Sequence, residues 1–210
     1  MQNSEENNGM GKFMIFWLLL GISLCSCKQE TFSTQAELLQ YLHGEDSEYV
    51  QEKTINGVTF SLAYRPTDML VAQEINEEIN SEELAALREK YKGQLYFNLS
   101  MSARNKELLS SIPNNRNEFG AMVNQLAFGM GEKAHLITQR KDTLEMQDFI
   151  YPRMYGMSNA TTIMFVYPRK EESLKEDYMH FTLEDIGLQV GEVKFKIPTD
   201  IIKEEPKLSF

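Results

Sequence analysis

Cysteine, proline and tryptophan are scarce in this chain of 210 residues, which contains two cysteines, six prolines and one tryptophan. Two cysteines are too few for a scaffold held together by disulfides. Six prolines and twelve glycines exclude a collagen-like or low-complexity protein. Basic residues are in the minority, because 21 lysines and arginines face 31 aspartates and glutamates, giving a formal net charge of −10. A surface of this sign repels phosphate backbones, so nucleic acid is not an expected partner.

One uncharged, apolar run stands out, at residues 13–24. It is shorter than the roughly 20 residues that a membrane-spanning helix needs, but it has the length of the apolar core of a signal peptide. Lys12 supplies the basic residue that precedes such a core, whereas Glu5 and Glu6 fit this region poorly. A chain that begins at Met10 fits the pattern better, so we expect Met10, rather than the first residue, to be the initiator.

The apolar run ends in Leu24-Cys25-Ser26-Cys27. This segment resembles the lipobox of bacterial lipoproteins, in which a leucine stands three residues before the modified cysteine and a small residue stands directly before it. The match falls on Cys27, because Leu24 is too large for the position before Cys25. The resemblance implies diacylation of the Cys27 thiol and cleavage of the chain before it. An ordinary cleaved signal peptide is the alternative.

Cysteine usage agrees with export, because no cysteine follows Cys27. A chain sent to an oxidising compartment either pairs its cysteines or lacks them. Two acyl chains hold a protein stably on a membrane, whereas one chain binds only marginally. The chain after the leader carries 20 basic and 29 acidic side chains, a surface that anionic head groups repel. The lipid on Cys27 is therefore the expected contact with the membrane.

The sequence predicts a signal peptide at residues 1–27, a short tether at residues 28–32 and a single α+β domain at residues 33–210. Asn56-Gly57 predicts a type I′ hairpin turn. Helical spacing of apolar residues and strand-like alternation divide the domain into predicted helices at 33–43, 68–92 with a break at 80–81, and 119–130, and predicted strands at 49–55, 58–65, 94–103, 134–140, 143–150, 160–167, 177–183 and 191–197. Because helices and strands do not alternate as βαβ units, we expect an antiparallel sheet of about seven to eight strands packed with two to four helices.

No pattern in the sequence carries a catalytic signature. The G-x-G-x-x-A match at 129–134 follows a predicted helix and precedes a predicted strand, so it reads as a helix end rather than a dinucleotide site. The three histidines lack metal-ligand spacing. We therefore expect no catalytic residue, metal or cofactor. Asp148 and Asp185 lie near predicted strand ends and leave open a carboxylate pair of the glycosidase kind.

Two Tyr-Pro-Arg segments fall at predicted strand ends, and Tyr64-Arg65-Pro66 resembles them. Tyrosine, methionine and arginine are enriched in protein interfaces. The residues of these segments and of the stretch between them form a predicted contact surface for a protein or glycan partner: Tyr151, Arg153, Met154, Tyr155, Tyr167 and Arg169. The simpler interpretation is that proline ends each strand, tyrosine covers the core edge and arginine stays in water.

Asp142-Thr143-Leu144 falls at a predicted hairpin tip. It resembles the Asp-Ser/Thr-apolar site at which envelope proteins of Bacteroidetes-type bacteria are O-glycosylated, and this implies Thr143 as an acceptor. The leader, the first helix and the Asn-Gly hairpin together are similar to those of small envelope lipoproteins from the same bacteria.

These features predict an exported lipoprotein, anchored to the outer membrane and facing the periplasm, although surface display stays open. The short tether, the acidic domain and the missing catalytic signature favour a non-enzymatic binding or accessory module of an envelope complex, with a protein partner. Two alternatives remain. An acidic domain would speed capture of a basic toxin or enzyme, as an inhibitor or immunity-type protein does. A glycan-binding or glycan-hydrolysing protein is the other.

Overall fold

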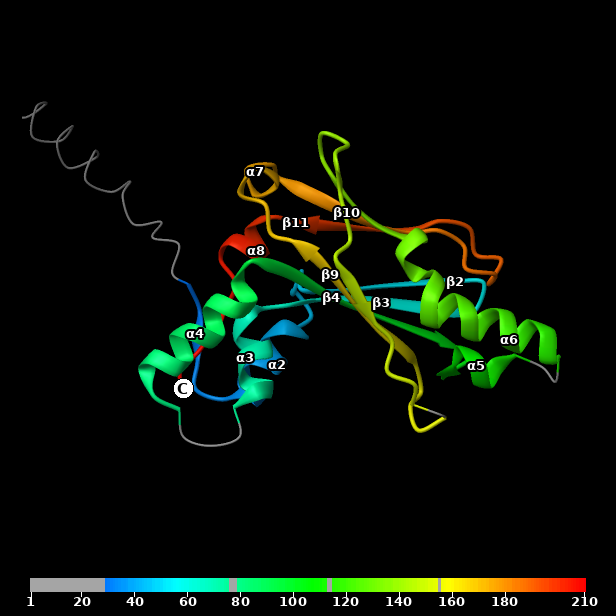
Figure 1. The fold of residues 1–210 in the computed structure, drawn as a ribbon, viewed down its shortest axis with the longest axis horizontal. Helices are drawn as coiled ribbons and strands as arrows, with labels where there is room; N and C mark the ends of the chain where they lie inside the picture. Colours follow the sequence, from blue (N-terminus) through cyan, green and yellow to red (C-terminus); the bar gives the residue numbers. More distant parts are fainter. Residues whose placement is uncertain (1–28, 76–78, 113–114, 155) are drawn as a thin grey trace, which may run out of the picture.

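Two antiparallel sheets that pack face to face form the centre of the molecule (Figure 1). The computed structural model describes residues 29–75, 79–112, 115–154 and 156–210, so the leader with Cys27 lies outside the described residues. The larger sheet consists, in order, of β2 (Val50–Ile55), β3 (Val58–Arg65), β4 (Gln94–Ala103), β9 (Thr161–Pro168) and β8 (Asp148–Ile150), with β5 (Lys106–Glu107) paired to β4. The smaller sheet consists of β11 (Val193–Pro198), β10 (Tyr178–Leu183), β6 (Ala134–Thr138) and β7 (Thr143–Leu144).

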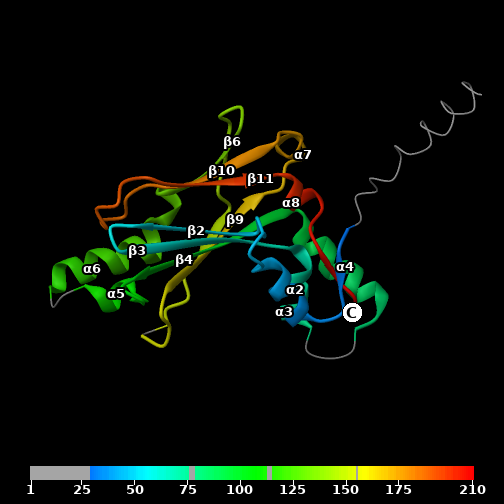
Figure 2. The same ribbon diagram turned by 180° about the vertical axis from the view of Figure 1, so that it is seen from behind.

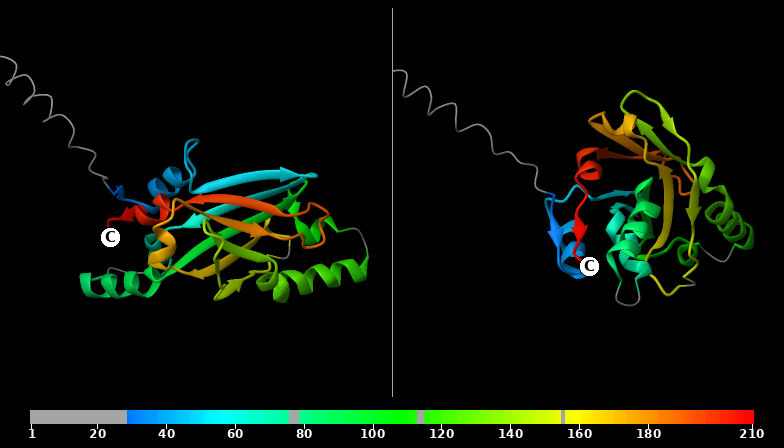
Figure 3. Two further views of the ribbon diagram at one scale, coloured as in Figure 1. Left: turned by 90° about the horizontal axis from the view of Figure 1, so that it is seen from above. Right: turned by 60° about the vertical axis from the view of Figure 1, so that its left-hand side comes forward.

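Residues that alternate between buried and partly exposed along the strands produce the interface between the sheets. Every second residue of β3 is buried, and the side chains between them are only partly covered. Phe181 of β10 reaches across to the larger sheet, with ring centroids 6.1 Å from Phe97 and 5.4 Å from Phe165. Large aromatic side chains bury the most apolar surface and prefer such tilted contacts. The smaller sheet therefore lies over the larger one when the molecule is seen from above (Figure 3, left).

The helices gather at the two ends of the sheets (Figures 1 and 2). One end carries α2 (Gln35–Leu42), α3 (Thr67–Glu74), α4 (Ser81–Lys92), α7 (Glu171–Leu174) and α8 (Asp200–Lys203). The other end carries α5 (Leu108–Ser111) and α6 (Arg116–Asn124), which continues as a π-turn (Gln125–Gly129) and a 3₁₀ turn (Met130–Glu132). A parallel pair of short strands, β1 (Thr31–Phe32) and β12 (Lys207–Leu208), joins the beginning and the end of the described chain at the α2 end.

The predicted α+β class is confirmed, and so is the antiparallel pairing within both large sheets. Asn56 and Gly57 adopt positive φ angles of 51° and 77° at the hairpin turn, as a type I′ turn requires. Asn80 caps α4 and breaks the helical region where the sequence predicts it. The glycines at 129–131 do end a helix before a strand.

The predicted numbers of strands and helices are too low, since the described residues contain twelve strands and seven α-helices. Two-residue strands and four-residue helices are too short to show periodicity. One predicted strand, 143–150, is divided between the sheets. Leu144 pairs with Leu136 of the smaller sheet, whereas Phe149 pairs with Phe165 of the larger one.

The carboxylate of Glu205 holds the C-terminal segment against the larger sheet. It accepts hydrogen bonds from the Tyr64 hydroxyl (2.9 Å), from the Thr67 backbone N–H (2.9 Å) and hydroxyl (3.0 Å), and from Arg169 Nη1 (2.7 Å). Arg169 also donates to the carbonyl of Ile202. The side chains of Arg169 and Glu205 are only 15% and 12% exposed, so this ion pair is largely withdrawn from water.

A second buried carboxylate repeats this arrangement at β12. Asp68 forms a two-pronged pair with Arg88, at 2.8 and 2.7 Å, and accepts the backbone N–H of Leu208 at 2.8 Å. Arg88 in turn donates to the Leu208 carbonyl at 2.9 Å. Two-pronged arginine–carboxylate pairs are among the stronger hydrogen-bonded contacts in proteins. The chain end is thus fixed by two ion pairs that reach it from α3, α4 and the end of β9.

The first prediction concerns this anchoring. Glu205→Gln leaves the Arg169 guanidinium buried without its counter-charge, which costs about 3 kcal/mol of folding free energy. Chemical denaturation measures the loss. Glu204→Gln is the matched control, because Glu204 is exposed and such changes alter stability by about 0.5 kcal/mol or less. Equal stabilities for the two variants would contradict the structural role of Glu205.

Candidate functional site

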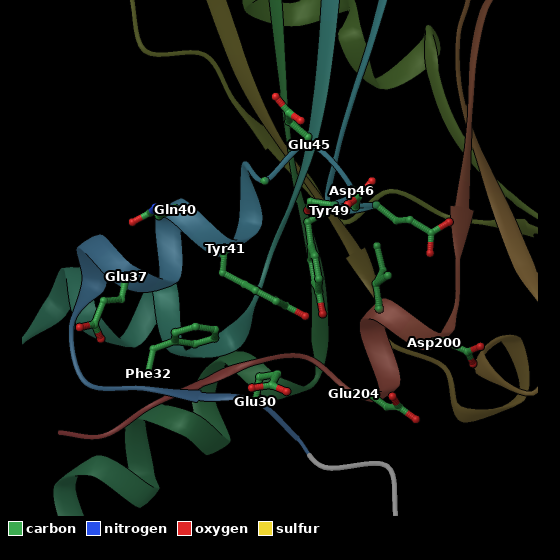
Figure 4. A pocket seen from close by; sticks show the side chains of 14 residues that line it. Glu30, Phe32, Glu37, Gln40, Tyr41, Glu45, Asp46, Tyr49, Asp200 and Glu204 are labelled. Atoms are coloured by element: carbon green, nitrogen blue, oxygen red, sulfur yellow. Dashed lines mark hydrogen bonds between the residues drawn. The ribbon is translucent and has the colours of Figure 1, made fainter. Parts of the chain in front are cut away.

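A groove of about 960 Å³ opens at the α2 end of the molecule. It lies between α2 with the loop that follows it, the strand β1, and α8 (Figure 4). Its size is at the upper end of the range of about 300–1,000 Å³ that is typical of ligand sites. The groove is therefore large enough for several side chains of a partner.

Carboxylates dominate the lining of the groove. They come from four separate parts of the chain: Glu30, Glu37, Glu45, Asp46, Glu48, Asp200 and Glu204. Among the described residues, no lysine, arginine or histidine lines it. Glu37 is engaged in the cap of α2, where it accepts the backbone N–H groups of Ser33 and Thr34. Asp200 forms an ion pair with Lys203 at 2.5 Å. The remaining five carboxylates give the groove a negative potential, which favours positively charged ligands.

Three aromatic rings form the floor between these carboxylates. Phe32 and Tyr41 have ring centroids 4.9 Å apart, and Tyr41 and Tyr49 have centroids 5.9 Å apart. The hydroxyl groups of the two tyrosines point toward the middle of the groove in Figure 4. Aromatic faces attract ammonium and guanidinium groups, so rings among carboxylates favour lysine and arginine side chains in two independent ways.

Tyr49 connects this floor to the core. It is only 7% exposed, and its ring stacks at 6.4 Å on Tyr64, whose hydroxyl binds Glu205. Burial raises the pKa of Tyr49, and the neighbouring Tyr41, Glu205 and Glu204 raise this pKa further. Tyr49 therefore stays neutral under physiological conditions and contributes a ring and a hydroxyl rather than a charge.

The loop after α2 is shaped by local hydrogen bonds. Ser47 Oγ donates to the carbonyl of Leu42 and accepts the N–H of Tyr49, and the N–H of Ser47 donates to Gly44. Short polar side chains stabilise tight turns in this way. The turn brings Glu45 and Asp46 to the rim of the groove (Figure 4).

Tyr167 and Arg169 do not lie on the surface as predicted contact residues would. Tyr167 is fully buried, and its hydroxyl donates to the carbonyl of Ala134 at 3.1 Å. Arg169 pairs with Glu205 inside the fold. The structure thus places both residues in contacts that hold the fold together, because proline ends β9 and the flanking side chains turn inward. We assign these two positions to the fold.

The other members of the predicted contact surface follow β8. Tyr151 is half-buried against the main core, whereas Arg153 and Met154 are exposed. Tyr155 lies outside the described residues. Met157 in the same loop is 78% exposed. None of the described residues of this loop lines the acidic groove, so the predicted residues are not brought together into one site. A contact role for Arg153 and Met154 stays a prediction.

Thr143 is exposed at the start of β7. The turn before it is tight, with Lys141 at a φ angle of 72° and the Thr138 N–H bonded to the Asp142 carbonyl at 2.8 Å. The predicted hairpin tip is confirmed, because β6 and β7 pair on either side of this turn. O-glycosylation of Thr143 stays a prediction.

The carboxylates of Asp148 and Asp185 form local backbone contacts. Asp148 accepts the N–H of Phe149, and Asp185 accepts those of Gly187 and Leu188.

In the described part of the chain, no three histidine, cysteine, aspartate or glutamate side chains are grouped as a metal site requires. The helices within those residues are all too short or too polar to cross a membrane.

Sequence reasoning missed the groove because its carboxylates are far apart in the chain. Glu30 and Glu204 are separated by most of the domain, and only the fold brings them together. The one local signal is the acidic stretch at 45–48, which stands between Tyr41 and Tyr49.

Searches with this chain against models of protein families, curated proteins and solved structures give no match.

The second prediction concerns the burial of Tyr49. Below the ordinary tyrosine pKa of about 10, folded and unfolded chains both hold the proton. At higher pH only the unfolded chain releases it, so the free energy of unfolding falls by up to about 1.4 kcal/mol per pH unit for this residue. Urea unfolding between about pH 9 and 11 measures the slope. Tyr49→Phe should reduce this pH dependence of the unfolding free energy. Tyr41→Phe is the control, because Tyr41 is 41% exposed. An unchanged slope in Tyr49→Phe would argue against this burial.

Proposed function

We propose that this protein is an exported, lipid-anchored binding module of the bacterial envelope, and that its acidic groove holds a segment rich in lysine and arginine from a protein partner. The observation that carries the proposal is the lining of the groove. Seven carboxylates and three aromatic rings surround one cavity of about 960 Å³. Among the described residues no basic side chain lines it, and Lys203 pairs with only one of the seven carboxylates, Asp200.

The free energies of single contacts favour a bound segment with several positive charges over a single cation. One exposed ion pair contributes up to about 1 kcal/mol, and one cation over an aromatic face contributes about 0.5–1 kcal/mol. Micromolar affinity requires about 8 kcal/mol. Several basic side chains must therefore bind together, with their aliphatic stems against Phe32 and Tyr41.

The position of the groove in the chain supports a role at the membrane. Glu30 lines the groove and follows the lipobox cysteine, Cys27, by three residues. Three residues span at most about 11 Å. If Cys27 carries two acyl chains, the groove stays close to the head groups. Anionic head groups are repelled by its carboxylates, which leaves it open to a basic segment of a membrane-associated protein. We place the protein at the outer membrane, facing the periplasm.

The same groove favours one alternative, an inhibitor or immunity-type protein that captures a basic toxin or enzyme. The two functions share the chemistry of the groove and differ in the partner. An envelope component co-purifies with membranes of unstressed cells, whereas a basic toxin binds from solution. Binding or hydrolysis of glycans stays a prediction from the sequence.

The third prediction tests the anchor. Cells that express the full chain and receive labelled palmitate should incorporate the label into the wild-type protein. Cys27→Ala should abolish the label and release the protein from the membrane fraction. Cys25→Ala is the control, because Cys25 is not the modified cysteine of the lipobox, and this variant should keep both the label and the membrane attachment. Labelling that survives in Cys27→Ala would remove the anchor from the proposal.

The fourth prediction tests the groove. Glu45→Lys/Glu204→Lys reverses charge on two opposite walls and should weaken association with the partner at least about tenfold, since each lost attraction becomes a repulsion. Affinity capture from detergent-solubilised envelopes, at low and at high salt, measures the effect. Binding to the wild type should fall with salt.

The control for this experiment is Glu52→Lys/Glu145→Lys, which makes the same change of charge at two exposed positions outside the groove. It should bind the partner as the wild type does. Equal loss in both double variants would show that overall charge, rather than the groove, controls binding. A partner retained in full by Glu45→Lys/Glu204→Lys would contradict the proposed function.

A further inference from the structure

A second, smaller cavity of about 160 Å³ lies on the outer face of the larger sheet, against α2 and α3. Its floor is formed by residues that alternate with the core side chains of β3 and β4. Ser61 stands opposite Ser100, and Ala63 stands opposite Asn98. Arg65, the last residue of β3, closes the row. The cavity is thus built on strands of the central sheet rather than on a loop.

Arg65 is the exceptional residue of this cavity. Its Nε–H is buried and has no hydrogen-bond partner in the described part of the chain. Arg88 and Arg169, which are also partly buried, each pair with a carboxylate. Burial lowers the pKa of Arg65, and no carboxylate in the described part of the chain offsets this cost. Guanidinium groups remain charged in proteins, so a cation faces the cavity without a counter-ion from the described residues.

The remaining lining combines hydrogen-bonding groups with an apolar wall. The sheet supplies the hydroxyl and amide groups of Ser61, Ser100 and Asn98, beside Val50 of β2, which pairs with Ala63. The helical side is largely apolar, with Leu39, Leu42 and Met69, and carries His43 at the end of α2. Among the described residues, no aspartate or glutamate lines the cavity, in contrast to the acidic groove.

We propose that this cavity binds a small organic carboxylate. The carboxylate group pairs with the guanidinium fork of Arg65, which matches its geometry. It thereby supplies the counter-charge that no described residue provides. The aliphatic part of the ligand lies against Leu42 and Met69. A cavity of about 150 Å³ holds a benzene molecule of six carbon atoms, so the ligand has about four to six non-hydrogen atoms, as acetate, propionate and butyrate do.

The fifth prediction tests this site on the purified, folded protein with butyrate and with inorganic phosphate as probes. Chemical shifts of backbone amides report binding. Butyrate should shift the amides of residues that line the cavity, with a dissociation constant of about 1 mM or tighter. Phosphate should bind at least about tenfold more weakly, because its hydration conflicts with the apolar wall.

Three variants complete the test. Arg65→Met should abolish butyrate binding and leave the melting temperature equal or higher, since it removes an unpaired buried donor. Ala63→Leu, which fills the cavity and keeps the guanidinium, should also abolish binding. Arg104→Met removes an exposed arginine outside this cavity and should change nothing.

Several results would overturn the proposal. The site is absent if the wild-type protein binds neither butyrate nor phosphate when each is present at about 50 mM, a concentration that detects even very weak affinity. Phosphate binding that equals butyrate binding excludes the carboxylate assignment. Arg65→Met could melt at a lower temperature than the wild type while Ala63→Leu binds butyrate unchanged. These two results together would show that Arg65 only stabilises the fold.

Discussion

The ion pair between Glu205 and Arg169 is the contact on which the functional end of the molecule depends. Glu205 ties the C-terminal segment to β3, to the start of α3 and to the end of β9. That segment includes α8, which supplies Asp200 and Glu204 to one wall of the groove. Asp68 and Arg88 hold the following strand, β12, which pairs with β1 and so positions the other wall. Two ion pairs therefore hold the segments that carry both sides of the groove.

Two cavities of opposite electrostatic character lie near α2. The groove has carboxylates around aromatic rings and favours a basic ligand. The smaller cavity has an unpaired guanidinium beside hydroxyl groups and favours an anion. Both use the end of α2, since Tyr41 lines the groove while Leu42 and His43 line the cavity.

Local sequence predicts local structure well here. The Asn56-Gly57 turn, the Asn80 break and the alternation at 94–103 all correspond to the structure, because each depends on neighbouring residues alone. The sites could not be predicted in this way. The partners of Glu205 come from β3, α3 and the residue after β9. Tyr167 is buried for reasons of packing that spacing does not encode, whereas Tyr151 is only half-buried. The Arg65 Nε–H has no partner within the described residues, because none of them brings a carboxylate near it.

The central claim is that the groove binds a basic segment of a protein partner next to the membrane. A photo-crosslinking amino acid in place of Tyr41, in the membrane-attached protein of living cells, tests it most directly. Mass spectrometry then identifies the captured peptide. The account predicts one dominant product, joined through a segment rich in lysine and arginine, with none from the same probe at position 145. Products from position 145 alone, or an acidic or neutral captured segment at position 41, would contradict it.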